Sequence, residues 1–259
     1  MLPPIQRYAP QVAVVMDAVG DARRSLDLDL TEPRVELFAD QFGVDVSVID
    51  DDLRRRFLEA TGPTAFEVVQ AIYVDDYWPR VAAMSMQLFG PVTSEQLPPV
   101  EPVDLWPLLE EFMREVARLD TLDPVLTELV RLRGARQHEC RLCKSRRSVA
   151  ALDAGASDDT FAAVDHYDDS DLPAATRAAL ALTDAMIWTP YAVPEPVLAA
   201  ATEHLAPEQA VEVVLDVTRN AANKIAVALG ADAATVTEGV ELFTTDADGH
   251  LTVVERPPG

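Results

Sequence analysis

Apolar residues spaced three and four positions apart recur along most of this chain, and this spacing restricts its fold more than any other feature. Residues 34–42 and 51–60 follow it, and 64–88 form a long apolar run that contains Pro79. Such spacing places apolar side chains on one face of an α-helix. The sequence therefore predicts an all-α fold, in which Pro79 kinks or divides its helix.

The proline-rich stretch 91–104 predicts a linker. We expect a helical N-terminal half at 1–100 without cysteines, a second half at 101–240 and a tail at 241–259. In the second half, the predicted helices are 104–119, 123–136, 138–153, 157–165, 172–187, 194–204 and 207–229. The tail alternates apolar and polar residues around 246–249, which predicts a small β-hairpin packed on the body or on a neighbouring subunit.

Two segments of the chain resemble each other and predict a weak internal repeat. Residues 34–69 and 177–214 place similar apolar and acidic residues in the same order, and a long apolar helix followed by a glycine ends each copy. The alternative is that two amphipathic helical stretches match by chance. If the repeat is real, the first copy is a structural partner and not a second active site.

The charge and the hydropathy of the chain narrow its partners. The formal net charge is −23, which argues against nucleic acid and anionic membrane surfaces as partners. No run of apolar residues is long enough to span a bilayer. The first residues also lack the pattern of a signal peptide, so we expect a cytoplasmic protein.

The only two cysteines, Cys140 and Cys143, form a C-x-x-C motif within a cationic run. This spacing lets both sulfurs meet within one helical turn and cycle between dithiol and disulfide. Nearby cations favour a thiolate and so make a cysteine reactive. Seven of the 21 Lys and Arg residues fall within 17 positions here: Arg131, Arg133, Arg136, Arg141, Lys144, Arg146 and Arg147.

A helix over 138–153 would give the cysteines distinct roles. Cys140 would lie in its first turn, where the helix dipole favours a thiolate, and Cys143 would resolve the intermediate. The reverse order stays open. Arg136 joins the same face if the helix begins a turn earlier, and with Lys144 it is a candidate substrate-binding residue. Four residues would share this face: Cys140, Cys143, Lys144 and Arg147.

Two further side chains are candidates for moving protons. Glu128 lies twelve residues before Cys140 on the preceding helix, and His138 adjoins the motif. The alternative for Glu128 is a surface charge paired with Arg131 or Arg133, and for His138 a solvated position. Zinc is disfavoured because there is no second cysteine pair and the other histidines lack ligand spacing. We therefore expect no metal and no cofactor. A buried, inert cysteine pair is the remaining alternative.

The pattern Glu128-x11-Cys140-x2-Cys143 resembles the signature of the alkylhydroperoxidase D family, within the carboxymuconolactone decarboxylase-like superfamily. Residues 150–157, the Trp188-Thr-Pro190 run and the stretch 220–224 are also similar to that family. The resemblance covers about 104–240. It implies the helical fold of that family and assembly as a homo-oligomer, for which a dimer, a trimer and a hexamer all stay open.

The resemblance also implies a thiol-dependent peroxidase or a dithiol-disulfide oxidoreductase. One cysteine would attack a hydroperoxide, the other would close the disulfide, and a lipoyl or thioredoxin-like donor would reduce it. Glu128 would accept the proton. This sequence departs from the family because Arg147 stands where a histidine is usual, and Leu142 where some members have another. Arginine cannot shuttle protons, so we expect Arg147 to stabilise the thiolate, bind an anionic substrate or pair with Glu128, and His138 to replace the imidazole.

Two alternatives to the redox enzyme remain. One is a degenerate, non-catalytic or redox-sensing protein, which the missing histidine favours. The other is a cofactor-free decarboxylase acting on an anionic substrate, which the arginine run favours because guanidinium groups hold carboxylates in bidentate fashion.

Overall fold

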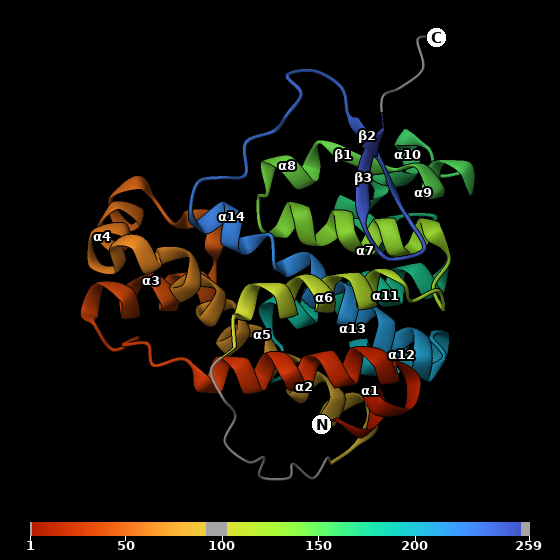
Figure 1. The fold of residues 1–259 in the computed structure, drawn as a ribbon. Helices are drawn as coiled ribbons and strands as arrows, with labels where there is room; N and C mark the ends of the chain where they lie inside the picture. Colours follow the sequence, from red (N-terminus) through yellow and green to blue (C-terminus); the bar gives the residue numbers. More distant parts are fainter. Residues whose placement is uncertain (1, 92–102, 255–259) are drawn as a thin grey trace.

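A computed structural model describes residues 2–91 and 103–254 of the protein, which are mostly helical with one small sheet (Figure 1). The predominance of helix is as predicted. No helix among these residues is long and apolar enough to cross a membrane.

The N-terminal helices that begin at Pro3, Pro10 and Ala65 have no side-chain cap, whereas side chains cap some of the others. Asp50, for example, accepts a hydrogen bond from the backbone of Leu53 and caps the next helix. The predicted division at Pro79 is wrong, since α5 (Ala65–Phe89) continues through Pro79 as a single helix, whereas the predicted kink stays a prediction. The elements of this half are α1 (Pro3–Tyr8), α2 (Pro10–Ser25), α3 (Pro33–Val44), η1 (Val46–Val48), α4 (Asp51–Thr61), η2 (Gly62–Thr64) and α5 (Ala65–Phe89).

The C-terminal half matches the predicted helices except in three places. The predicted helix 138–153 is broken into shorter elements, 157–165 is divided into an α-helix and a 3-10 helix, and 207–229 is divided into two α-helices. The helices of this half are α6 (Leu105–Ala117), α7 (Pro124–Gln137), α8 (Arg141–Lys144), α9 (Val149–Asp153), α10 (Asp158–Ala162), η3 (Ala163–Asp169), α11 (Ala174–Trp188), α12 (Glu195–His204), α13 (Pro207–Ala221) and α14 (Lys224–Ala228).

A three-stranded sheet joins the cysteine segment, residues 138–148, to the C-terminal tail. The predicted hairpin is confirmed as β2 (Glu241–Thr245) and β3 (Leu251–Val254), paired antiparallel. β1 (Arg146–Ser148) adds to it in parallel, with Arg146 opposite Glu241 and Ser148 opposite Phe243. The hairpin therefore packs on the body of its own chain, and its turn reaches α6, where Gly249 lies against the backbone of Arg114.

One hydrophobic core joins helices from both halves of the chain. It contains Val12 and Val19 of α2, Phe112 of α6 and Val213 of α13. Buried polar contacts reinforce this packing, since the Tyr73 hydroxyl of α5 donates to the Thr218 carbonyl of α13 at 2.7 Å. The predicted linker 91–104 and most of its prolines lie outside the described residues, and the repeat stays a prediction.

Candidate redox site

The cysteine segment forms a sharp connection rather than the predicted helix over 138–153. α7 ends at Gln137, and Glu139 adopts a left-handed conformation with φ of 53°, which interrupts helical geometry. Cys140 is the N-cap of the one-turn helix α8. The chain then extends as β1, because backbone bonds to β2 replace helical ones there. The four residues predicted to share one helical face therefore do not share one.

Cys140 and Cys143 are joined as a disulfide with 5.3 Å between their Cα atoms. The pair is nearly inaccessible to bulk solvent, with relative exposures of 1% and 9%. The backbone N–H of Cys143 donates to Cys140 Sγ at 3.2 Å. A donor in this position stabilises negative charge on sulfur when the pair is reduced, which favours a thiolate on Cys140.

Glu128 binds Arg131, which in turn holds the backbone around Cys143. The Arg131 guanidinium donates to both Glu128 carboxylate oxygens, at 2.6 and 2.7 Å. It also donates to the carbonyls of Cys143 and Arg146, each at 2.9 Å. Glu128 is 2% exposed and also accepts from the Ser148 N–H. The predicted partner Arg131 is thus correct, but the pair is buried and fixes the backbone around Cys143.

The cationic run does not form an unpaired positive patch. Six of its seven members each bind a carboxylate: Arg131 with Glu128, Arg133 with Asp184, Arg136 with Asp165, Arg141 with Asp232, Lys144 with Glu139 and Arg146 with Glu241. The thiolate-favouring field inferred from their density is therefore largely neutralised.

Three of the predicted site cations lie away from the cavity described below. Arg136 also donates to the Phe161 carbonyl at 2.8 Å, and neither it nor Lys144 lines the cavity. Arg147 donates to the carbonyls of Lys144 and Arg146, and its guanidinium lies 5.1 Å from the Phe161 ring centroid. No ion pair joins Arg147 to Glu128. The predicted substrate-binding roles of Arg136 and Lys144 are thus not supported by their positions.

A cavity of about 550 Å³ lies against the disulfide. Its walls come from α6, α7, the cysteine segment, α13 and the hairpin. This volume is typical of small-molecule sites. Much of the lining is apolar, including Met113, Leu142, Phe243 and Leu251.

His138 lines the same cavity as the cysteines. It is buried, so the predicted alternative of a solvated position is wrong, and its Nε2 lies 3.3 Å from the Tyr77 hydroxyl. Burial, together with the charges of Lys224 and Arg80, lowers the pKa of His138 well below its usual value. The imidazole is therefore neutral at physiological pH, when it can accept or pass on a proton.

Two residues of α13 that the sequence analysis missed also line the cavity. Asp216 is 2% exposed, and its Oδ2 has no hydrogen-bond partner among the described residues. Burial raises the pKa of Asp216 to about 8. Arg219 lies one turn further along. Polar residues at 212, 216 and 219 in an otherwise valine-rich helix were the available signal, because this spacing of four and three puts them on one face.

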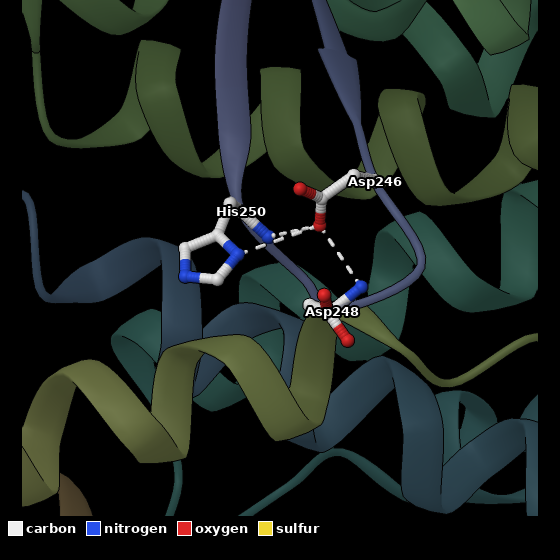
Figure 2. Close-up of side chains that lie close together, drawn as sticks. All are labelled: Asp246, Asp248 and His250. Atoms are coloured by element: carbon white, nitrogen blue, oxygen red, sulfur yellow. Dashed lines mark hydrogen bonds and ion pairs between the residues drawn. The ribbon is translucent and has the colours of Figure 1, made fainter.

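The hairpin turn brings together a second group of polar side chains, Asp246, Asp248 and His250 (Figure 2). Asp246 Oδ1 accepts from the backbone N–H of Asp248 and of His250, both at 2.9 Å, and lies 3.5 Å from His250 Nδ1. All three side chains are exposed. These bonds account for the cluster as the cap of a tight turn.

Comparisons with known proteins identify relatives but no function. No protein-family model and no solved structure matches the chain. Two relatives from Mycobacterium tuberculosis are the uncharacterized protein Rv2313c of strain ATCC 25618 / H37Rv and the uncharacterized protein MT2376 of strain CDC 1551 / Oshkosh. Each is 41% identical over 228 residues, which are 85% of this chain and 80% of the relative. The chain belongs to the family of these two proteins.

Proposed function

We propose that the protein is a thiol-dependent oxidoreductase that reduces hydroperoxides through Cys140 and Cys143. The observation that carries this proposal is that both cysteines line a cavity large enough for a small substrate. The resemblance of Glu128, Cys140 and Cys143 to the alkylhydroperoxidase D signature supports it, and we extend the proposal to the fold and homo-oligomeric assembly of that family.

The reaction begins at Cys140, whose sulfur accepts the Cys143 N–H. The Cys140 thiolate attacks the terminal oxygen of the hydroperoxide, and the O–O bond breaks. Cys140 becomes a sulfenic acid, and the alkoxide takes up the proton that the thiol had lost. The Cys143 thiol then attacks Cys140 Sγ, forming the S–S bond and releasing water.

Regeneration requires a donor that supplies two electrons and two protons. One donor thiolate attacks the disulfide and forms a mixed disulfide with the protein. The second donor thiol then attacks the donor sulfur of that bond, which leaves an oxidised donor and the two reduced cysteines. Because the two sulfurs are 1% and 9% exposed, the donor thiols must enter the cavity. A slender lipoyl arm suits this requirement better than the flat surface of a thioredoxin-like protein.

Proton transfer in this scheme uses groups other than the expected carboxylate. Both oxygens of Glu128 are already bonded to Arg131, so Glu128 and Arg131 together hold the Cys143 backbone in place. His138 is the neutral imidazole that lines the cavity, and it is our candidate for the role of the missing family histidine. Replacing His138 by Ala should change the pH–rate profile, and an unchanged profile would exclude this role.

The proposal is tested by mixing the reduced protein with a few equivalents of an organic hydroperoxide. Formation of the Cys140–Cys143 disulfide is followed by quenched mass spectrometry. We expect oxidation orders of magnitude faster than that of a model dithiol. Cys143→Ser should accumulate a sulfenic acid on Cys140, whereas Cys140→Ser should not react.

Slow oxidation by hydroperoxide would contradict peroxidase activity. Rapid exchange with small disulfides would then indicate a dithiol-disulfide oxidoreductase, and inertness to both would indicate a non-catalytic protein. An activity on anionic acids that survives thiol alkylation would instead support the decarboxylase alternative.

A further inference from the structure

The α13 wall of the cavity holds a charge without a partner. Arg114, Arg131, Arg146 and Arg219 are the Lys or Arg residues among the described residues that line the cavity. The first three are ion-paired with Glu111, Glu128 and Glu241, respectively. Arg219 forms no ion pair or side-chain hydrogen bond with any described residue, and Asp216 on the same helix does not neutralise it through a contact.

No described residue forms an ion pair with the Arg219 guanidinium. Burial lowers the pKa of Arg219, the nearby Asp216 carboxyl opposes this shift, and Arg131 adds to it. Asp216 is buried, and its raised pKa of about 8 keeps it protonated at neutral pH. His138 is neutral there for the opposite reason. Glu110 and Asp120 also line the cavity but are solvent-exposed, so water screens their charges. Arg219 is therefore the cation of the cavity lining that has no ion-pair partner among the described residues.

Asp216 provides an independent indication of a ligand. A buried oxygen without a hydrogen-bond partner is rare in proteins, because its desolvation is not offset. Asp216 Oδ2 is such an oxygen among the described residues, and Asp216 lines the cavity. A protonated carboxyl group donates a hydrogen bond. Asp216 and Arg219 line the cavity from adjacent turns of α13, so each can supply a donor to a ligand held there.

The rest of the cavity is suited to an aliphatic chain. α6 contributes Met113 and Val116, the cysteine segment Leu142, and the hairpin Phe243 and Leu251. A ligand that satisfies both regions carries an anionic group at one end and an apolar chain at the other. A single guanidinium with one adjacent donor suits the planar, bidentate geometry of a carboxylate.

We infer that Arg219 and Asp216 form a carboxylate-binding subsite, so that the substrate presented to Cys140 and Cys143 is an aliphatic acid bearing a hydroperoxide. The nature of the reacting group rests on the proposed function, whereas the carboxylate subsite rests on the charges and the unpartnered oxygen of α13. The apolar side chains of α6, the cysteine segment and the hairpin hold the aliphatic chain of the substrate, and the cysteines receive its hydroperoxide group.

The first test measures binding alone, on the oxidised protein, by isothermal titration calorimetry with dodecanoate and with its methyl ester. A charge-assisted contact makes the acid bind about tenfold to hundredfold more tightly than the ester. Arg219→Met should remove this preference, and Arg219→Lys should retain part of it. Arg114→Met is the matched control, because Arg114 lines the same cavity but is paired on its own helix, and it should keep the full preference.

Equal binding of the acid and the ester to the unmodified protein would overturn the subsite, and this comparison requires no variant to fold. A preference that survives Arg219→Met in a folded variant, as judged by circular dichroism, would overturn it as well.

The second test compares a fatty-acid hydroperoxide with its methyl ester in the quenched oxidation assay. Faster oxidation by the acid, lost in Arg219→Met but not in Arg114→Met, is the expected result. A binding preference without any disulfide formation would contradict the proposed function and leave the subsite standing. Rapid oxidation that does not distinguish the acid from the ester would support the proposed function and contradict the subsite.

Discussion

The two polar walls of the cavity differ in how their charges are matched. On the cysteine wall, the Arg131 guanidinium binds both oxygens of Glu128 and two backbone carbonyls. On the α13 wall, Arg219 has no carboxylate partner among the described residues, and Asp216 has an oxygen without a hydrogen bond. The wall that is rich in cations is thus saturated, and the wall with a single cation is not.

This difference separates two uses of charge in a protein interior. A buried charge whose hydrogen bonds are all made holds the backbone in a fixed geometry, at a cost in desolvation that its partner offsets. A buried charge without a partner retains its capacity to bind and is therefore available to a ligand. The cation-rich run of the sequence contains buried charges of the paired kind. Which charges remain unpaired and free to bind a ligand depends on the folded structure.

The largest effect is expected from disrupting the ion pair between Glu128 and Arg131 on the cysteine wall. Glu128→Gln leaves Arg131 charged and buried with a neutral partner, which should lower the free energy of unfolding by about 3–5 kcal/mol. Urea unfolding measures this change. Glu139→Gln is the matched control, since Glu139 pairs with Lys144 at the surface, and it should cost less than about 1 kcal/mol. Similar losses in both variants would show that the Glu128–Arg131 pair is no more important than a surface one.

An intermediate effect is expected where the hairpin closes the cavity over both walls. A Cβ at Gly249 would lie 2.4 Å from the Arg114 carbonyl oxygen, and its φ is 81°. Gly249→Ala should therefore cost about 2 kcal/mol or more and separate the hairpin turn from α6. Hydrogen exchange of the β2 amides reports this opening.

Gly239→Ala provides the matched control for the hairpin. Gly239 has a similar φ of 72°, but nothing lies within 4 Å of its Cβ position. Its substitution should carry only the conformational cost of about 1 kcal/mol and leave exchange in β2 unchanged. Equal effects of the two substitutions would mean that the contact with Arg114 does not hold the hairpin.

The smallest effect concerns the pH dependence of the unfolding free energy, which Asp216 on the α13 wall is expected to influence. Burial raises the pKa of Asp216 to about 8 in the folded state from its ordinary value of 3.8, so the folded protein holds a proton that the unfolded chain releases. This stabilisation is complete below about pH 4 and is lost as the pH rises toward 8. Between pH 6 and 7, the wild type should lose about 1.36 kcal/mol relative to Asp216→Asn. Parallel pH profiles of unfolding free energy would show that Asp216 is ionised in the folded protein.

The sequence predicted the helical framework well because its evidence is local. Apolar spacing acts within a few turns of the chain, and the helices predicted at 104–119 and 123–136 appear as α6 and α7. The segment 138–153 failed for a non-local reason. β1 exists because it pairs with β2, and the contact between Arg146 and Glu241 spans 95 residues.

In the candidate site, too, contacts between sequence neighbours could be predicted and contacts between distant residues could not. The disulfide and the contact between Glu128 and Arg131 follow from short spacings, and the sequence contained both. The partners of the other cations are more distant, as with Asp184 for Arg133 and Asp232 for Arg141. Spacing alone could not pair them, so their charges were counted as free. Arg219 was missed for the converse reason, since an isolated arginine on an amphipathic helix gives no hint that its neighbours leave it unpaired.

The parallel pairing of β1 with β2 also sets the order in which the site can form during synthesis. Glu241 follows Arg146 by 95 residues, and a ribosome that adds about 5–20 residues per second needs roughly 5–20 s to cover that interval. During this time the cysteines have left the ribosome before the hairpin that covers them exists. The nascent chain therefore passes through a period in which its two thiols are not yet enclosed by the hairpin.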